Sequence, residues 1–338
     1  MTVIALDAMG GDFAPRVPVE AAVQAAREDG TEVILVGDEG PLEQALARHR
    51  HDPARIKIRH ASQAIAMDEA ATSLLRGKAD ASVRVAVELV ARGEAQAALS
   101  AGPSGAMMVA GKHVLRTLEG IERPAIATPL PLRRGAAVLL DSGANVDCKP
   151  HYLVQFAAMG EVYARAVLGL AEPRVALLSN GGEPGKGNEL VREAYALLER
   201  APLRFVGNVE ARDLFKGKAD VLVTDGFTGN LVLKAAEAAN DQVRVLTKEA
   251  VAVSMLARLG YWLMRGIYRD LERRKDYREI GGALLLGVNG VAMICHGGSN
   301  ARALKNAIRT ARHCVENGLI ERMARAFRER ALAGPARA

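Results

Sequence analysis

A glycine-rich loop between an apolar segment and a helical pattern is the stretch of the sequence best suited to hold an anion. Residues 175–189 read VALLSNGGEPGKGNE; the apolar run stops at Ser179 and the helical pattern begins at Asn188. Amide groups at a helix N-terminus point outward, and the helix dipole favours negative charge there. Glycines let the backbone approach a ligand closely, and Lys186 adds a positive charge because lysine titrates near about 10.4. The pattern predicts an oxyanion-binding loop.

Similar polar loops follow several other apolar segments. The segment 221–225 (VLVTD) leads into Gly226-Phe227-Thr228-Gly229-Asn230 and a helical run, LVLKAAEAA. In open α/β sheets, ligands bind outside the carboxyl ends of the strands. If the sheet is parallel, these loops therefore meet at one edge. The loops concerned are 7–12, 100–105, 141–145, 180–188, 225–230 and 296–299.

Several standard catalytic motifs are absent. The loop around Lys186 fails the G-x-x-x-x-G-K-[ST] pattern of nucleotide-binding P-loops, and no G-x-G-x-x-G follows an apolar segment. Asp38 stands where a ribose-binding acid would, which by itself is weak support for a dinucleotide site. No G-x-S-x-G elbow presents a serine nucleophile. The remaining donors suit binding an oxyanion, or stabilising one formed in a reaction.

Each of these residues also has a structural interpretation that the sequence leaves open. Lys186 could be a solvated lysine, and Asn188 and Asn230 could be helix caps. His296 could be a hydrogen-bonded core histidine. Met107 and Met108 could fill the core rather than line an acyl pocket. From the residues alone we predict an α/β enzyme that acts on a phosphate or an acyl phosphate.

Composition limits the class of protein. The 338 residues suffice for one large α/β domain, possibly with two lobes, and the net charge of +6 suits acidic partners or an anionic membrane surface. Three scattered cysteines indicate a reducing compartment and no zinc site. We see no signal peptide and no apolar run as long as the roughly 18 residues of a membrane span. These observations favour a cytoplasmic protein.

Apolar segments alternate with helical patterns along most of the chain. This alternation predicts a layered sheet with helices on both faces. A helical stretch over about 235–274 interrupts it, with arginines interleaved among Leu259, Trp262, Leu263 and Ile267. That composition is typical of a membrane-facing helix, of packing or of a dimer interface. The predicted strands are 3–6, 33–37, 56–60, 97–100, 125–130, 137–141, 175–178, 205–208, 221–225, 283–286 and 291–295.

Many of these segments together resemble the bacterial phosphate acyltransferase family (acyl-ACP:phosphate acyltransferase, PlsX). The resemblance spans nearly the whole chain in order. It rests on residues 5–15 (ALDAMGGDFAP), 66–70 (AMDEA), 100–108 (SAGPSGAMM), 123–131 (RPAIATPLP), 139–164, 177–198, 205–234 and 281–308.

The resemblance implies a transferase that moves a fatty acyl group from acyl carrier protein to inorganic phosphate, giving acyl phosphate for phospholipid (phosphatidic acid) synthesis. It implies a three-layer αβα Rossmann-like fold, similar to phosphotransacetylase and isocitrate/isopropylmalate dehydrogenase, with a protruding helical pair at about 240–278. It also implies a homodimer with no metal or nucleotide cofactor and no nucleic-acid partner. The protein would sit in the cytoplasm, in peripheral contact with an anionic membrane and with a membrane glycerol-phosphate acyltransferase.

On this basis we assign roles to individual residues. Lys186 and Asn230 are the predicted catalytic pair. The predicted phosphate- or substrate-binding residues are Asp7, Gly10, Gly11, Asp12, Ser100, Gly102, Ser104, Gly105, Asn188 and His296. The predicted acyl groove or membrane face comprises Met107, Met108, Leu259, Trp262, Leu263 and Ile267.

Two segments depart from the family pattern. The usual S-A-G-N-T-G-A is here SAGPSGA, in which Pro103 removes an amide donor and Ser104 keeps a hydroxyl. The usual K-K-D-S-S-M is here KADASV, residues 78–83, with a lysine and a serine lost. Lys186 and Asn230 lie in matching motifs.

Two rival classes remain. A dehydrogenase of the related fold needs a nicotinamide site and usually a carboxylate cluster for a metal, and we find neither in the sequence. A non-enzymatic membrane or carrier-protein adaptor would use the basic helical stretch alone and leave the polar loops without a role.

Overall fold

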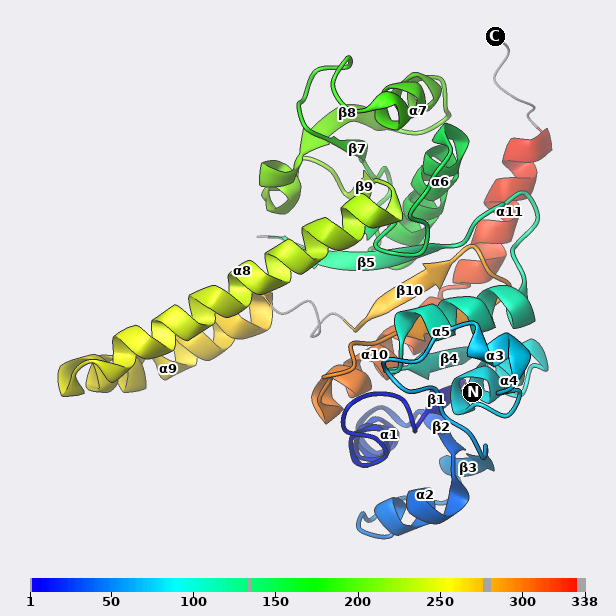
Figure 1. The fold of residues 1–338 in the computed structure, drawn as a ribbon, viewed down its shortest axis with the longest axis vertical. Coiled ribbons are helices and arrows are strands. Elements are labelled where there is room, and N and C mark those ends of the chain that lie inside the picture. The colour runs from blue at the N-terminus through cyan, green and yellow to red at the C-terminus, as the bar shows by residue number, and fades with distance from the viewer. Residues whose placement is uncertain (1, 133–134, 276–280, 333–338) are drawn as a thin grey trace.

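Eleven strands of the computed structural model form one continuous sheet, in the order β3-β2-β1-β4-β11-β10-β5-β6-β9-β7-β8 (Figure 1). The structure describes residues 2–132, 135–275 and 281–332. Each of the eleven predicted strand segments overlaps one of these strands. They are β1 (Val3–Asp7), β2 (Glu32–Gly37), β3 (Ile56–His60), β4 (Ala97–Ser100), β5 (Ala125–Pro131), β6 (Ala136–Leu140), β7 (Val175–Ser179), β8 (Phe205–Glu210), β9 (Val221–Val223), β10 (Ala283–Leu286) and β11 (Val291–Ile294).

Helices cover both faces of this sheet, because alternate residues of one strand pack against different helices. Ile4 and Leu6 of β1 pack into one hydrophobic cluster with α1 and α10, whereas Ala5 packs into a second cluster with α4 and α5. Successive side chains of a strand point to opposite faces, so the sheet is the middle of three layers, as predicted. The helices are α1 (Arg16–Asp29), α2 (Glu39–Leu46), α3 (Ser73–Arg76), α4 (Ser82–Ala91), α5 (Ser104–Ala110), α6 (Pro150–Ala166), α7 (Glu189–Glu199), α8 (Gly226–Ala252), α9 (Met255–Lys275), α10 (Ala301–Glu316) and α11 (Leu319–Leu332), with short helical turns at Gly111–Leu115 and Ala211–Lys216.

The sheet is mixed, and its two halves run in opposite directions. β3, β2, β1, β4 and β11 are mutually parallel, and so are β6, β9, β7 and β8. Between the halves, β10 is antiparallel to both β11 and β5, and β5 is antiparallel to β6. The polar loops therefore follow two oppositely directed sets of strands. The expectation that all of them share one edge of a parallel sheet is wrong, but it holds for the loops 180–188 and 225–230, because β7 and β9 are parallel neighbours.

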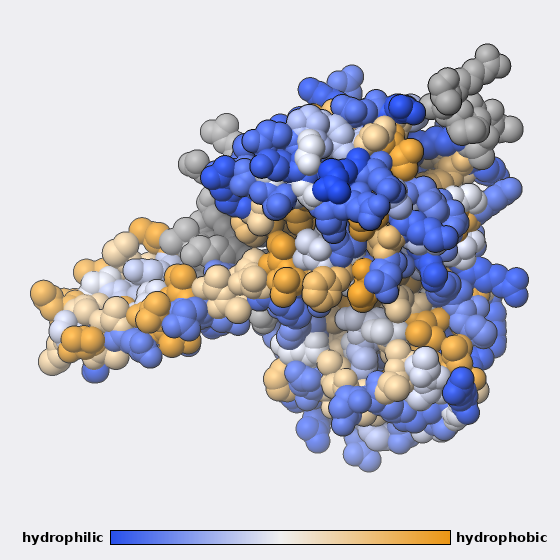
Figure 2. All heavy atoms as spheres, turned by 45° about the horizontal axis from the view of Figure 1, so that its top comes forward, coloured by the Kyte–Doolittle hydropathy of each residue, from blue (hydrophilic) through white to orange (hydrophobic). Residues whose placement is uncertain are grey.

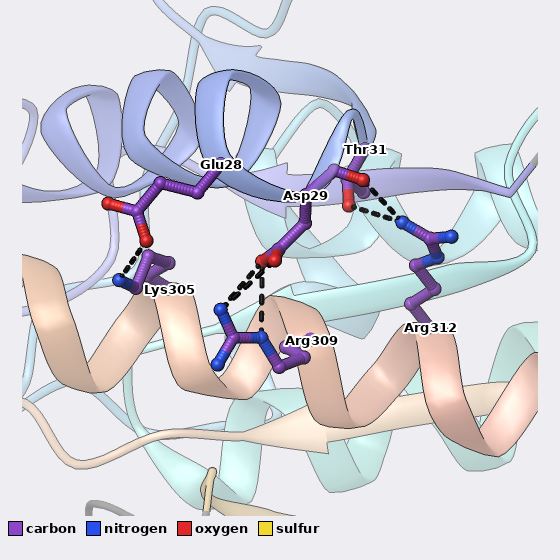
Figure 3. A network of polar contacts seen from close by, with 6 residues as sticks. All are labelled: Glu28, Asp29, Thr31, Lys305, Arg309 and Arg312. Atoms are coloured by element: carbon purple, nitrogen blue, oxygen red, sulfur yellow. Dashed lines mark hydrogen bonds and ion pairs between the residues drawn. The ribbon is translucent and has the colours of Figure 1, made fainter.

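Ion pairs join two helices that are far apart in the sequence but adjacent in the structure. Lys305 of α10 contacts Glu28 at the end of α1, 2.6 Å from its Oε2, and Arg309 donates to Asp29. Arg312 donates to the carbonyl oxygen of Asp29 at 2.6 Å and contacts the Thr31 hydroxyl. Figure 3 shows the three cations of α10 facing the end of α1. This network fixes α10 against the body of the protein.

Helices α8 and α9 protrude from the body as an antiparallel pair, the arm (Figure 1). We predicted a helical run at 231–239 and a helical stretch over about 235–274; α8 begins earlier, at Gly226, where Asp225 caps it by accepting the Thr228 amide at 2.8 Å. Ser254 separates the helices; its hydroxyl accepts the Ala257 amide at 3.0 Å. The predicted insertion continues to 278, and 276–280 lie outside the described residues. In the described parts of the chain, no helix is apolar enough over sufficient length to cross a membrane.

Candidate active site

Loops from three neighbouring parallel strands meet at the ends of β1, β4 and β11. Ser100 Oγ donates to the buried Asp7 carboxylate at 2.6 Å and accepts the Gly102 amide at 2.9 Å. A β-carbon on Gly10 would lie only 2.7 Å from the Gly102 nitrogen, so only glycine permits this approach. The Asp12 amide donates to the Gly297 carbonyl at 3.0 Å. This bond joins the loop after β11 to the loop after β1.

Asp7 is the buried centre of this first loop cluster. Burial raises the pKa of its carboxyl, and hydrogen bonds from the Ser100 and Ser82 hydroxyls oppose that rise. Ser82 belongs to the segment 78–83 that departs from the family pattern, and its hydroxyl makes this contact with Asp7. Pro103 lies immediately before α5, where a missing amide removes no helical hydrogen bond.

A second loop cluster is built around Asp141, which is fully buried at the end of β6. Its Oδ1 accepts the amides of Ile126 at 2.9 Å and Ala144 at 3.0 Å. Its Oδ2 accepts the backbone amide of Asn145 at 2.7 Å and its side-chain amide at 2.9 Å. Burial raises the pKa of Asp141, and the amides of Ala144 and Ile126 oppose the rise. One carboxylate thus shapes the whole loop 141–145 and ties it to β5.

Helix α8 starts in direct backbone contact with this loop. A β-carbon on Gly229 would lie 1.9 Å from the Asp141 carbonyl oxygen, and one on Gly226 would lie 2.6 Å from the Asn145 carbonyl oxygen. Both positions therefore require glycine. The contact fixes the rotation of α8 and places Asn230 beside Gly143, where a β-carbon would lie 3.8 Å from Asn230 Oδ1.

A cavity of about 310 Å³ lies between the two halves of the sheet, which is at the small end of the usual size for small-molecule sites. Residues from both halves and from the central strand β5 line it. Its polar lining is Ser104, Thr128, Ser142, Asn230, Lys234, Glu237, His296 and Ser299. Its apolar lining includes Ile126, Leu233, Ala283, Ile294, Cys295 and Ala303.

Hydroxyl groups and a helix N-terminus make one part of this cavity suited to an anion. Ser142 Oγ lies 2.7 Å from Thr128 Oγ1, and either hydroxyl can donate to the other; Ser142 can donate to the Ile126 carbonyl at 3.1 Å or, with Thr128 as its donor, turn its hydrogen toward a ligand. Ser299, just before the 16-residue α10, and Ala303, in its first turn, also line the cavity. The positive end of the α10 dipole is therefore directed at the cavity.

The cysteine in the cavity wall is not prepared for nucleophilic attack. Burial raises the pKa of Cys295 to about 12, so its thiol is protonated at neutral pH, whereas the reactive form of cysteine is the thiolate. A covalent cysteine mechanism is therefore disfavoured. Among the described residues, no group of three or more His, Cys, Asp or Glu side chains is arranged to hold a metal ion.

The structure brings some of the predicted site residues to the cavity and places others beside it. Ser104, Asn230 and His296 line the cavity. His296 is exposed and accepts the Gly298 amide at 3.0 Å, so the alternative of a core histidine is wrong. The remaining predicted residues of the first half belong to the first loop cluster or the adjoining start of α5: Asp7, Gly10, Gly11, Asp12, Ser100, Gly102 and Gly105.

Lys186 and Asn188 lie on a different loop, between β7 and α7. Asn188 caps α7 by accepting the Val191 amide at 3.0 Å, so the helix-cap interpretation of this residue is confirmed. Lys186 is exposed and is not among the residues that line the cavity. Its stem lies over Gly181, where a β-carbon would be 2.7 Å from Lys186 Cγ. Asn208 supports this loop by donating to the Glu183 carbonyl at 2.8 Å.

The residues predicted for an acyl groove or membrane face divide between core and surface. Met107 is 1% exposed in the core, and Met108 is half-buried against the same cluster. Neither is among the residues that line the cavity. Leu259, Trp262, Leu263 and Ile267 are between 54% and 69% exposed on α9. Figure 2 shows apolar residues gathered on the protruding arm.

Sequence reasoning missed three polar residues of the cavity wall, Thr128, Lys234 and Glu237, whereas Ser142 and Ser299 lie in the predicted polar loops 141–145 and 296–299. For Lys234 and Glu237 a signal existed, because they follow Asn230 at helical spacing within LVLKAAEAA. Thr128 had none, because it sits inside an apolar strand.

Comparisons with known proteins agree with this architecture. The family model described as "Fatty acid synthesis protein" matches residues 2–322. A "Phosphate acyltransferase" from Geobacter sulfurreducens is 52% identical over 321 residues, covering 95% of this chain and 93% of that protein. A phosphotransacetylase from Streptococcus pyogenes has a similar fold, with a TM-score of 0.63 and 20% identity over 93% of this chain and 94% of that one.

A second solved structure supports the predicted relation to dehydrogenases. The fold of a 4-hydroxythreonine-4-phosphate dehydrogenase from Klebsiella pneumoniae matches with a TM-score of 0.53 and 16% identity, over 93% of this chain and 99% of that one. At such identities the structural likeness shows the fold alone, whereas the sequence match extends over nearly the whole chain. The chain therefore belongs to the fatty acid synthesis protein family.

Proposed function

We propose that this protein is a phosphate acyltransferase that moves a fatty acyl group from acyl carrier protein to inorganic phosphate. The observation that carries the proposal is the cavity between the halves of the sheet, where hydroxyl groups and the α10 N-terminus adjoin an apolar wall. Such a cavity suits a reaction that joins an anion to an apolar chain. The similarity to proteins named "Phosphate acyltransferase" supports the same reaction.

The proposed reaction needs positioning rather than a strong base. Phosphate has a second pKa near about 6 and is largely dianionic at neutral pH. One of its oxygens attacks the thioester carbonyl, the carbon–sulfur bond breaks, and the thiolate leaves and takes up a proton. Holding the two reactants together supplies much of the acceleration. In our proposal Asn230, aided by Ser104 and His296, stabilises the oxyanion that forms, and Lys186 assists from its loop.

The test is release of the carrier thiol. Acyl carrier protein loaded with a fatty acyl group should release its thiol when the protein and phosphate are both present, and acyl phosphate should accumulate in equal amount. The thiol is measured with a chromogenic disulfide and the acyl phosphate with hydroxylamine. Release that is independent of phosphate, or that occurs equally with sulfate, would contradict the proposal. Binding of NAD, measured by fluorescence quenching, would favour the dehydrogenase alternative.

The arm suggests where the protein would release its acyl phosphate product. Its apolar residues are exposed, and Arg265 lies 5.1 Å from the ring centre of Trp262. Apolar and basic residues on one helix suit an anionic membrane surface. We propose that the arm places the protein, as a homodimer in the cytoplasm, in peripheral contact with the membrane. There the acyl phosphate would serve phospholipid synthesis by a membrane glycerol-phosphate acyltransferase.

Flotation with anionic vesicles tests this role of the arm. The parent protein should float with the vesicles, and a variant combining Trp262→Ser, Leu263→Ser and Ile267→Ser should remain at the bottom, because it loses three large apolar side chains that are exposed on α9. A matched control replaces Leu197, Val206 and Phe215, which are 42–44% exposed on the body, by serine. Full flotation of the arm variant would instead favour a packing role between two copies of the chain.

A further inference from the structure

An ion pair on α8 supplies charge to the cavity wall. Lys234 carries a positive charge at neutral pH and Glu237 a negative one, and both line the cavity. Lys234 Nζ lies 2.9 Å from Glu237 Oε2, and the two side chains are 56% and 22% exposed. Lys234 is the more exposed partner, and solvent weakens the attraction between exposed charges. Lys234 can therefore turn from Glu237 to another anion in the cavity.

We infer that Lys234 is the cation that receives the phosphate in this cavity, an inference that rests on the proposed function. Asn230 and Lys234 are four residues apart on α8, so their side chains lie on the same face of the helix, and both line the cavity. In our proposal Asn230 donates to the developing oxyanion, and Lys234, one turn further along α8, neutralises the phosphate beside it. A phosphate dianion carries more charge than the Glu237 carboxylate and competes with it for Lys234.

The packing of α8 determines which lysine faces the cavity. Because Gly229 lies directly on the Asp141 carbonyl, α8 cannot rotate without a clash, and the face that carries Asn230 and Lys234 stays turned toward the cavity. Lys186 is held elsewhere, over Gly181 on the loop after β7. The start of α10 also lines the cavity, through Ser299 and Ala303, and its dipole adds to the field of Lys234.

Steady-state kinetics of Lys234 variants test this inference. Lys234→Gln should raise KM for phosphate by on the order of tenfold or more, because a charge-assisted hydrogen bond is lost. KM for the acyl donor should stay unchanged, since in this inference binding of the donor does not depend on the positive charge of Lys234. Lys234→Arg keeps the charge and should recover most of the phosphate affinity. Lys248→Gln is the matched control, because Lys248 lies on the same helix and is not among the cavity-lining residues.

A binding measurement separates this inference from the proposed function. Phosphate should raise the thermal unfolding midpoint of the parent protein and of Lys248→Gln, but not that of Lys234→Gln. If the parent releases no thiol yet shows this pattern, the proposed function fails and the phosphate site at Lys234 stands. An unchanged KM for phosphate in Lys234→Gln, an equal rise in KM for the acyl donor, or an unaltered phosphate-dependent midpoint would overturn the inference.

Discussion

An Asn230→Ala variant should turn over the acyl donor on the order of 10²-fold more slowly than the parent, because one donor to the developing oxyanion is lost. Asn230 is well suited to that role, since it lines the cavity and lies beside Gly143 at the start of α8. The effect should appear in kcat more than in KM, because the oxyanion exists only in the transition state and the intermediate. The measurement is the initial rate of phosphate-dependent thiol release at saturating substrates.

Two further variants make the result specific. Asn230→Asp keeps the shape of the side chain but replaces its donor with a negative charge, so it should be at least as slow as Asn230→Ala. Gln242→Ala removes an exposed amide from the same helix outside the cavity and should keep the parent rate. Near-normal turnover of both Asn230 variants would remove Asn230 from the mechanism.

The same assay decides the role of Lys186. If Lys186 acts on the phosphate as we predict, Lys186→Ala should lose turnover while its thermal unfolding stays that of the parent, because the side chain is exposed. Turnover close to that of the parent would instead leave Lys186 as a solvated loop residue.

An Asp141→Ala variant should lose on the order of 3 kcal/mol or more of unfolding free energy, because several buried amides lose their acceptor at once. The amides of Ile126, Ala144 and Asn145 all donate to this carboxylate within 3.0 Å. The loop 141–145 also supports the start of α8, so activity should fall with stability. The measurement is the urea midpoint of unfolding by circular dichroism.

A matched carboxylate on the surface provides the control. Asp38 is exposed at the start of α2 and its side chain makes no capping hydrogen bond there, so Asp38→Ala should change stability by less than about 0.5 kcal/mol. An Asp141→Ala midpoint equal to that of the parent would mean that the loop does not depend on its central carboxylate.

The sequence by itself determined the elements of this protein, because secondary structure follows from a local pattern. Apolar runs bounded by glycine and polar residues predicted all eleven strands, and 56–60 is the same in prediction and structure. The interleaved apolar and basic residues predicted a helical stretch, and the family resemblance implied a protruding helical pair, which Figure 1 shows. Asn188 was predicted as a helix cap, since an asparagine before a helical run is a local signal.

Only the tertiary structure decided which of these elements meet. Strand direction depends on pairing between distant segments. No local sequence pattern therefore predicts the reversal of strand direction across β10, β5 and β6. Met107 has the same neighbours in the sequence whether it fills the core or lines a groove, and the packing of α5 places it in the core. Lys234 faces the cavity because two glycines let α8 lie on the loop of Asp141, a contact between segments far apart in the sequence.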